Sequence, residues 1–131
     1  MMKIHHIGYA VKNISKSMEM FVKLGYEIQK EAIKDEKRKV EIVFVCNNNY
    51  IIELISPLSD DSPIKNYLNK IGNTPYHICY ETNNIEATIV DLQKQRYFVI
   101  EKSIEAVAIN NQRVAFLYHP NYGLLELLEA L

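Results

Sequence analysis

Two histidines and two glutamates lie where their side chains could hold a metal ion. His6 is part of the apolar stretch Ile-His-His-Ile-Gly-Tyr-Ala, and His77 is part of the similar stretch Tyr-His-Ile-Cys-Tyr. Glu53 interrupts Ile-Ile-Glu-Leu-Ile, and Glu126 interrupts Leu-Leu-Glu-Leu-Leu. A carboxylate in a buried strand is costly unless something compensates its charge. Because two imidazoles and two carboxylates suit a divalent ion of Fe, Co, Ni, Zn or Mn, these four residues predict a metal site.

The four residues occupy equivalent places because the sequence contains one unit twice. With His6 set on His77, the two segments align without a gap for about two dozen residues. The identical matches are Ile7 with Ile78, Tyr9 with Tyr80, Asn13 with Asn84, Ile14 with Ile85, Lys23 with Lys94 and Tyr26 with Tyr97. Neighbouring strand residues point to opposite faces, so His5 and His6 cannot both face a site. The repeat selects His6.

Each unit is expected to fold as β-α-β-β-β. The first-unit strands are expected at Lys3–Val11, Tyr26–Ala32, Val40–Val45 and Tyr50–Ser56, with a helix between Asn13 and Gly25. The second-unit strands are expected at Tyr76–Thr82, Tyr97–Ile104, Gln112–Tyr118 and Gly123–Glu129, with a helix capped by Asn84. Because Arg96 stands where the first unit has Gly25, the second helix is expected to end differently.

The joint between the units predicts a short helix. Ser62 is the expected N-cap, Pro63 the first helical residue and Gly72 the residue after the end. The whole chain is then a single α+β domain over residues 1–131. It is divided into a module of about 1–56, a joint of about 57–74 and a module of about 75–131.

Composition excludes several classes of function. A net charge of -1 provides no basic surplus for nucleic acid or an anionic membrane surface. No apolar run approaches the roughly 20 residues that span a bilayer. The start of the chain lacks a signal-peptide core, and two cysteines, Cys46 and Cys79, form no disulfide framework. We therefore expect a cytoplasmic protein that binds a small molecule.

Simpler interpretations exist for each candidate residue. A lone strand histidine is more often structural than metal-binding, and either glutamate alone could face solvent from a half-exposed sheet. Coincidence of all four in a duplicated unit favours the metal site. Cys79 and Glu81 share the strand face of His77 and could join the site, although a core thiol and a solvated charge are the simpler interpretations. The charged turn Lys34–Lys39 could meet coenzyme A phosphates or be a solvated hairpin tip.

Several motifs resemble the vicinal oxygen chelate superfamily, which includes glyoxalase I, methylmalonyl-CoA epimerase, extradiol dioxygenases and resistance proteins. The motifs are His-Ile-Gly-Tyr-Ala-Val, Ile-Glu-Leu-Ile-Ser-Pro-Leu, Asp-Ser-Pro-Ile, Tyr-His-Ile, Arg-Val-Ala-Phe-Leu and the terminal Leu-Leu-Glu-Leu. The resemblance implies paired βαβββ modules whose curved mixed sheet encloses a metal and substrate cavity. By position, it also implies His6, Glu53, His77 and Glu126 as the metal ligands, and a homodimer.

Within that superfamily, two enzyme families compete. The Pro57–Ile64 joint, and Ala10 where bacterial-type glyoxalase I has an arginine for glutathione, favour a methylmalonyl-CoA epimerase-like enzyme acting on an acyl-CoA. A glyoxalase I-like lyase acting on a thiol hemithioacetal, lactoylglutathione lyase in type, is the alternative. A non-catalytic binding or resistance protein of the same fold is the third possibility.

The resemblance also implies the catalytic roles. By analogy with glyoxalase I, Glu126 is the ligand that also serves as base. Glu53 or Glu41 would then serve the other face of the carbon. A one-residue shift of register would replace Glu41 by Ile42.

Overall fold

The computed structural model describes residues 2–131 and divides the chain into two compact units. Module one is His6–Tyr76. Module two is His77–Leu131 together with the first residues of the chain up to His5. Each module is described below by itself.

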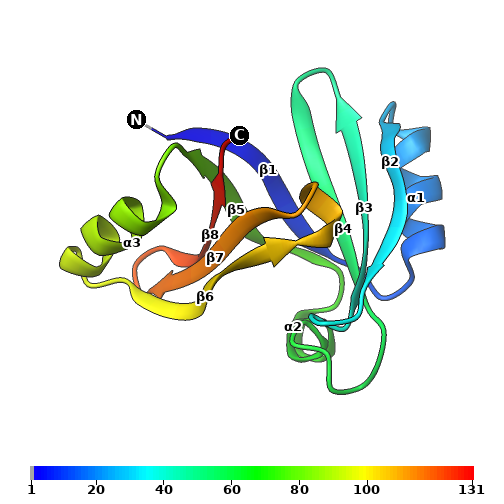
Figure 1. Cartoon of the computed structure of the whole chain (residues 1–131). Coiled ribbons are helices and arrows are strands. Elements are labelled where there is room, and N and C mark those ends of the chain that lie inside the picture. Colours follow the sequence, from blue (N-terminus) through cyan, green and yellow to red (C-terminus); the bar gives the residue numbers. More distant parts are fainter. Residues whose placement is uncertain (1) are drawn as a thin grey trace. The chain divides into compact units, whose positions relative to one another are not determined.

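Module one has the expected β-α-β-β-β order (Figure 1). Its elements are β1 (Lys3–Ala10), α1 (Ile14–Lys23), β2 (Glu27–Asp35), β3 (Val40–Asn47) and β4 (Tyr50–Pro57). The strands lie in the order β2-β3-β4-β1, and β1 runs parallel to β4 whereas β2, β3 and β4 pair antiparallel. The sheet is therefore mixed, as predicted.

Module two repeats this plan. Its elements are β5 (Thr74–Thr82), α3 (Ile85–Lys94), β6 (Phe98–Ala106), β7 (Gln112–His119) and β8 (Gly123–Glu129). A short 3-10 turn, Val107–Ile109, precedes β7. The strands lie in the order β5-β8-β7-β6, with β5 parallel to β8 and the others antiparallel. The α+β class and the two βαβββ modules are thus confirmed, whereas one cavity enclosed by both modules stays a prediction.

In each module, one helix covers one face of the sheet. α1 contacts β2, β3 and β4, and α3 contacts β6, β7 and β8. The core of module one is formed by Val11, Ile14, Val43, Val45, Ile52 and Leu54. The core of module two is formed by Ile85, Leu92, Ala115, Leu117, Leu125 and Leu127. These residues alternate along each strand with the residues of the opposite face, so each sheet has a helix-covered face and a second face that carries the candidate ligands.

The two helices begin in the same way. Asn13 accepts a hydrogen bond from the backbone N–H of Lys16 at 3.0 Å, and Asn84 accepts one from that of Ala87 at 3.0 Å. Each asparagine thereby satisfies one of the backbone donors that a helix leaves unpaired at its start. Both N-caps agree with the sequence prediction.

The two helices also end in the same way, so the expectation of a different end at Arg96 was wrong. Gly25 has φ +103°, and Arg96 adopts a left-handed φ of 71° at the equivalent place. The following residues, Tyr26 and Tyr97, donate their backbone N–H to Phe21 and Leu92 at 3.1 and 3.0 Å. The tertiary position of the next strand therefore imposes the turn, and the arginine accepts a backbone conformation that favours glycine.

The joint folds as the short helix α2 (Lys65–Ile71) inside module one, but the helix begins later than predicted, so Pro63 precedes it and is not its first residue. Its N-cap is Ile64 rather than Ser62, and Ile64 makes no side-chain capping bond because its aliphatic side chain has no acceptor; that side chain is buried in the core. Ser62 instead closes a turn in which its carbonyl accepts from the Lys65 N–H. Gly72 ends the helix at φ 87°, as the sequence predicts.

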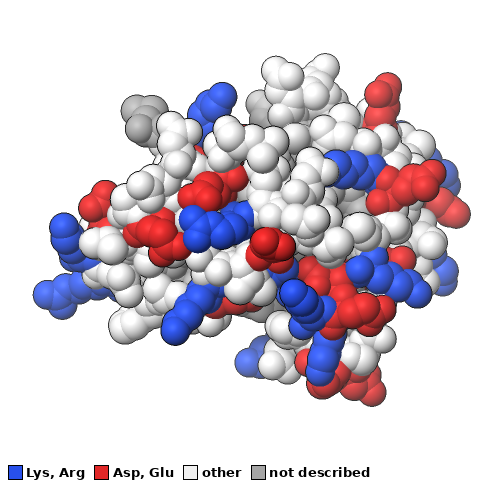
Figure 2. Space-filling model, viewed as in Figure 1, with Lys and Arg blue, Asp and Glu red and all other residues white. Residues whose placement is uncertain are grey.

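The charged surface is mixed in sign. Figure 2 shows lysine and arginine interspersed with aspartate and glutamate on the face in view. Arg38 pairs with Asp35 and Lys39 with Asp61 in module one. This arrangement agrees with the balanced net charge.

Candidate metal centre

Module one contains a buried histidine–glutamate pair. His6 lies on β1 and Glu53 on β4, and both side chains are buried. The parallel register pairs Gly8 with Glu53, which brings the carboxylate alongside His6. The His6 Nε2 and Glu53 Oε1 atoms lie 3.3 Å apart. The predicted ligands of this module therefore meet on one sheet face.

Module two contains the equivalent pair. His77 lies on β5 and Glu126 on β8, and both are buried. The register pairs Cys79 with Glu126, as Gly8 pairs with Glu53. The His77 Nε2 and Glu126 Oε1 atoms lie 3.0 Å apart. The same pair thus arises twice from the same strand geometry.

An aromatic ring supports each histidine. Phe44 packs edge-on against His6 with ring centroids 5.4 Å apart, and Phe116 packs against His77 at 5.3 Å. Phe44 lies opposite Glu53 in the β3–β4 register, and Phe116 lies opposite Glu126 in the β7–β8 register. Each phenylalanine therefore shields its histidine and its glutamate from water and restricts their motion.

The donor set fits a divalent transition metal. Metal–nitrogen and metal–oxygen bonds are about 2.0–2.2 Å, so two ligands at about a right angle lie about 3 Å apart. The Nε2–Oε1 distances of 3.3 Å and 3.0 Å inside the two pairs match this expected separation between two ligand atoms. His6, Glu53, His77 and Glu126 are all candidate metal ligands, and buried charged groups of this kind are usually paired or metal-bound. Their residue types and burial are consistent with a metal site; the identity of the metal is left open.

Glu41 does not share the face of the His6–Glu53 pair. β3 pairs with β4 without a bulge from Val40 to Asn47, so side chains alternate regularly along β3. Phe44 contacts His6, which places Ile42 on the ligand face and Glu41 on the helix-covered face. Ile42 rather than Glu41 therefore lies on the same sheet face as the His6–Glu53 pair.

The other polar candidates lie as follows. Cys79 is buried, which agrees with a core role, and Glu81 is half-buried. The charged turn Lys34–Lys39 is tied down locally: Asp35 accepts hydrogen bonds from the Arg38 backbone and guanidinium. Lys39 holds Asp61, and its ammonium lowers the pKa of the Asp61 carboxyl. These contacts agree with a hairpin tip held by local ion pairs.

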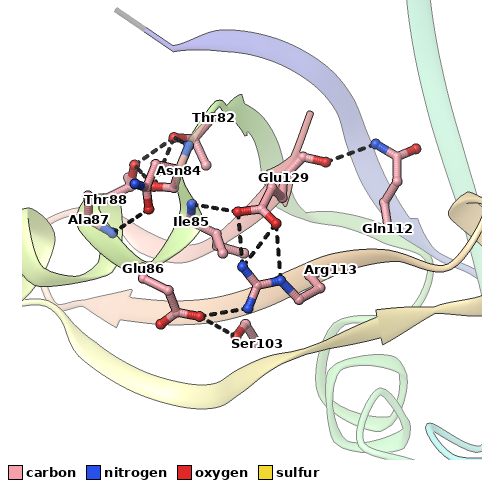
Figure 3. A network of polar contacts seen from close by, with 10 residues as sticks. All are labelled: Thr82, Asn84, Ile85, Glu86, Ala87, Thr88, Ser103, Gln112, Arg113 and Glu129. Atoms are coloured by element: carbon pink, nitrogen blue, oxygen red, sulfur yellow. Dashed lines mark hydrogen bonds and ion pairs between the residues drawn. The ribbon is translucent and has the colours of Figure 1, made fainter. Parts of the chain in front are cut away.

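One polar network was not recognised in the sequence (Figure 3). Glu129 accepts the backbone N–H of Ile85 at 3.0 Å and binds the Arg113 guanidinium through both carboxylate oxygens. Arg113 also donates to Glu86 at 2.8 Å, and Glu86 accepts from Ser103. The network fastens the first turn of α3 to β6, β7 and β8. Only the residue types at Arg113 and Glu129 hinted at it, since their partners are distant in sequence.

The contacts within this network shift the pKa values of Glu129 and Arg113. The Ile85 N–H and then the Arg113 guanidinium stabilise the charged carboxylate and lower the pKa of Glu129. The carboxylates of Glu129 and Glu86 raise the pKa of Arg113. Glu129 sits three residues after Glu126 on β8, so it lies on the helix-covered face, behind the candidate ligand.

The fold agrees with the family comparison. The chain belongs to the glyoxalase/bleomycin resistance protein/dioxygenase superfamily, whose family model matches residues 5–116. The fold is the glyoxalase-like fold of that superfamily, as the resemblance implied.

Sequence relatives include methylmalonyl-CoA epimerases. The chain is 32% identical over 133 residues to the mitochondrial methylmalonyl-CoA epimerase of Homo sapiens, covering 98% of this chain and 74% of that protein. It is 28% identical over 124 residues to the ethylmalonyl-CoA/methylmalonyl-CoA epimerase of Cereibacter sphaeroides, covering 92% of this chain and 91% of that protein. The similarity to this enzyme group is therefore distant and extends along the whole chain.

Solved structures share the fold. A hypothetical protein of Bacillus halodurans superposes with a TM-score of 0.88 at 28% identity, covering 99% of this chain and 95% of that one. A methylmalonyl-CoA epimerase in complex with methylmalonyl-CoA superposes with a TM-score of 0.86 at 23% identity, covering 98% and 94%. That epimerase binds an acyl-CoA.

Within residues 2–131, none of the helices has the length and apolar character that crossing a bilayer requires. A cytoplasmic location and a homodimer stay predictions.

Proposed function

We propose that the chain is a metal-dependent isomerase that removes a proton next to the carbonyl group of an acyl-CoA thioester, in the manner of methylmalonyl-CoA epimerase. The observation that carries this proposal is the buried histidine–glutamate pair that each module builds in the same way. Similarity to epimerases along the whole chain supports the reaction type.

The proposal joins the two pairs around one ion. His6 and Glu53 would supply two ligands, and His77 and Glu126 the other two. Duplication supports this arrangement, because two equivalent modules place equivalent side chains in equivalent surroundings. A divalent ion held there would supply Lewis-acid stabilisation of the negative charge that develops on the substrate oxygen.

Glu126 is proposed as the base. A carboxylate in the middle of a strand is held in one position by its neighbours, and Glu126 lies next to His77 and opposite Phe116 in the β7–β8 register. A fixed carboxylate in a dry site accepts a proton from a weak carbon acid without first shedding water. An epimerase needs a second proton carrier on the opposite face of the carbon. Glu53 takes that role, since Glu41 lies on the other side of its sheet.

A glyoxalase I-like lyase is the competing function. It would use the same four residues but return the proton to the neighbouring carbon of a thiol hemithioacetal. The epimerase relatives favour the acyl-CoA reaction, and so does Ala10 in place of a glutathione-binding arginine.

Two measurements test the proposal. Metal analysis of the purified protein is expected to find about one divalent ion per chain, and a protein that binds no ion with four wild-type ligands would support a binding or resistance protein instead. Deuterium exchange from solvent into the α-position of methylmalonyl-CoA is expected, whereas methylglyoxal with glutathione is expected to turn over poorly. The reverse preference would favour the lyase.

A further inference from the structure

An apolar row crosses three strands of module two on its ligand-bearing face. The register places Phe98 of β6 opposite Tyr118 of β7, and Tyr118 opposite Leu124 of β8. Phe98 is 62% exposed and Tyr118 is 42% exposed, while Leu124 is half-buried. Single exposed apolar side chains are common, but three in register form a continuous apolar surface, which marks an interaction site.

This row belongs to the same sheet face as the His77–Glu126 pair. Tyr118 alternates with Leu117, which is in the helix-covered core, and shares the side of Phe116, which contacts His77. Leu124 is two residues before Glu126 on β8. Two residues along a strand advance roughly 7 Å, so a chain of about five carbons reaches from Glu126 to Leu124, and Tyr118 and Phe98 continue the row across the next two strands.

Module one has a different row at the equivalent place. There the register joins Glu27 of β2, Cys46 of β3 and Ile51 of β4. A charged residue and a small thiol replace the two aromatic rings. The histidine–glutamate pairs are duplicated, whereas the row beside the pair is apolar in module two and contains a charged residue in module one.

We propose that the row Phe98–Tyr118–Leu124 binds the apolar part of the substrate, an alkyl chain or ring of about four or more carbons attached next to the reacting carbonyl group. The inference rests on the proposed function, because it takes the carbonyl group to lie at Glu126. It names these residues as determinants of chain-length specificity. Two aromatic faces and a leucine provide flat contact area at little conformational cost, which suits an apolar group of variable shape.

The test compares the binding of two chelating probes to the Co²⁺-loaded protein. Acetohydroxamate and hexanohydroxamate present the same two vicinal oxygens to a metal ion and differ only by four methylene groups. Partial burial of that chain on the row is expected to make hexanohydroxamate bind at least about ten-fold more tightly, since a fully buried methylene contributes about four-fold. Dissociation constants are read from the visible spectrum of the cobalt ion.

Phe98→Glu, which installs the residue of module one, is expected to reduce that ratio to about three or less, while the affinity for acetohydroxamate changes by less than about two-fold. Ile100→Glu is the matched control. Ile100 is 63% exposed on the same strand but lies at a bulge outside the row, so its variant is expected to keep the wild-type ratio.

The outcomes separate the two proposals. If Phe98→Glu keeps the wild-type ratio of the two dissociation constants, or if Ile100→Glu lowers that ratio equally, the row does not bind the alkyl chain. Either result leaves the proposed metal centre unaffected. Failure of both probes to perturb the cobalt spectrum of the wild-type protein overturns the proposed function and the row with it. A sedimentation experiment provides the last comparison. A dimer that Phe98→Glu converts to monomer, with the chain-length ratio retained, would assign the row to a subunit interface and overturn its role in substrate binding.

Discussion

The two modules share a backbone plan and differ in the side chains that stabilise it. Both have a capped helix, a buried histidine–glutamate pair and a phenylalanine beside each histidine. Their outer strands even break register at the same steps, between Ile28 and Lys30 in β2 and between Val99 and Glu101 in β6. In module two, a network of Arg113, Glu129 and Glu86 fastens the start of α3 to the sheet (Figure 3). The histidine–glutamate pair is thus among the features that both modules retain, whereas the contacts at the helix start differ.

The comparison extends to the ligand-bearing faces. Phe98 in module two stands where module one has Glu27, and Tyr118 stands where module one has Cys46. The candidate ligands are therefore duplicated, whereas the residues beside them differ between the modules. The predictions below test where the equivalence of the modules holds and where it fails.

The largest expected effect is on catalysis, where substitution of the two glutamates should have different consequences. Glu126→Gln is expected to lower turnover of an α-proton substrate by about a thousand-fold or more, because it removes the base. Glu53→Gln is expected to stop epimerisation yet still allow solvent deuterium to enter one epimer, because the base on the other face remains. Mass spectrometry and circular dichroism would read exchange and fold in parallel. Wild-type turnover by Glu126→Gln would exclude Glu126 as the base.

Next in size is the effect of opening a cavity in either core. Leu54 and Leu127 follow the two glutamates and are fully buried. Leu54→Ala and Leu127→Ala are each expected to lower the free energy of unfolding by about 2–5 kcal/mol. Urea denaturation measures both. Similar losses of unfolding free energy would show that the two cores contribute equally to stability. A difference above about 2 kcal/mol would show that one core contributes more than the other.

A smaller effect is expected from the network of module two. Glu129→Gln weakens the hydrogen bond to the Ile85 N–H and the ion pair with Arg113, and is expected to lower the free energy of unfolding by about 1 kcal/mol at neutral pH. Glu86→Gln, at the exposed end of the network, is the control and is expected to have less effect.

The pH dependence of that effect has a definite sign. Because the pKa of Glu129 is lower in the folded than in the unfolded protein, its contribution is complete above the ordinary carboxyl pKa of 4.5. It disappears as the pH falls through the lowered value. Thermal melts of wild type and Glu129→Gln should therefore begin to converge as the pH falls below 4.5 and coincide once it has passed the lowered value. A gap that persists in acid would assign the effect to packing.

The smallest effect distinguishes the two helix ends. Arg96→Gly is expected to stabilise the protein by about 0.5 kcal/mol, because relief of left-handed strain exceeds the extra entropy of the unfolded chain. Gly25→Ala is expected to destabilise by about 1 kcal/mol through strain alone, since the nearest atom to an added Cβ, Asn47 Nδ2, is 3.7 Å away. Thermal melting of both variants provides the measurement. Destabilisation by Arg96→Gly would show that the arginine side chain contributes a contact that outweighs the strain.

Most of the fold could be predicted because its signals are local. Strand alternation, asparagine caps and the repeat located the eight strands and the helices α1 and α3 to within a few residues. Ser62 failed as a helix cap because burial of Ile64 decided where α2 begins. Local preference predicts an element, and packing of its neighbours decides its end.

The sequence by itself determined the duplicated plan and the four candidate ligands, because a period of two or 3.6 residues and a repeated His and Glu are visible in one dimension. Only the tertiary structure decided that Glu41 faces away from the ligand pair, that Arg96 turns left-handed and that Glu129 reaches the start of α3. Those outcomes depend on strand register and on contacts between residues far apart in the chain, and neither is encoded in any short stretch of sequence.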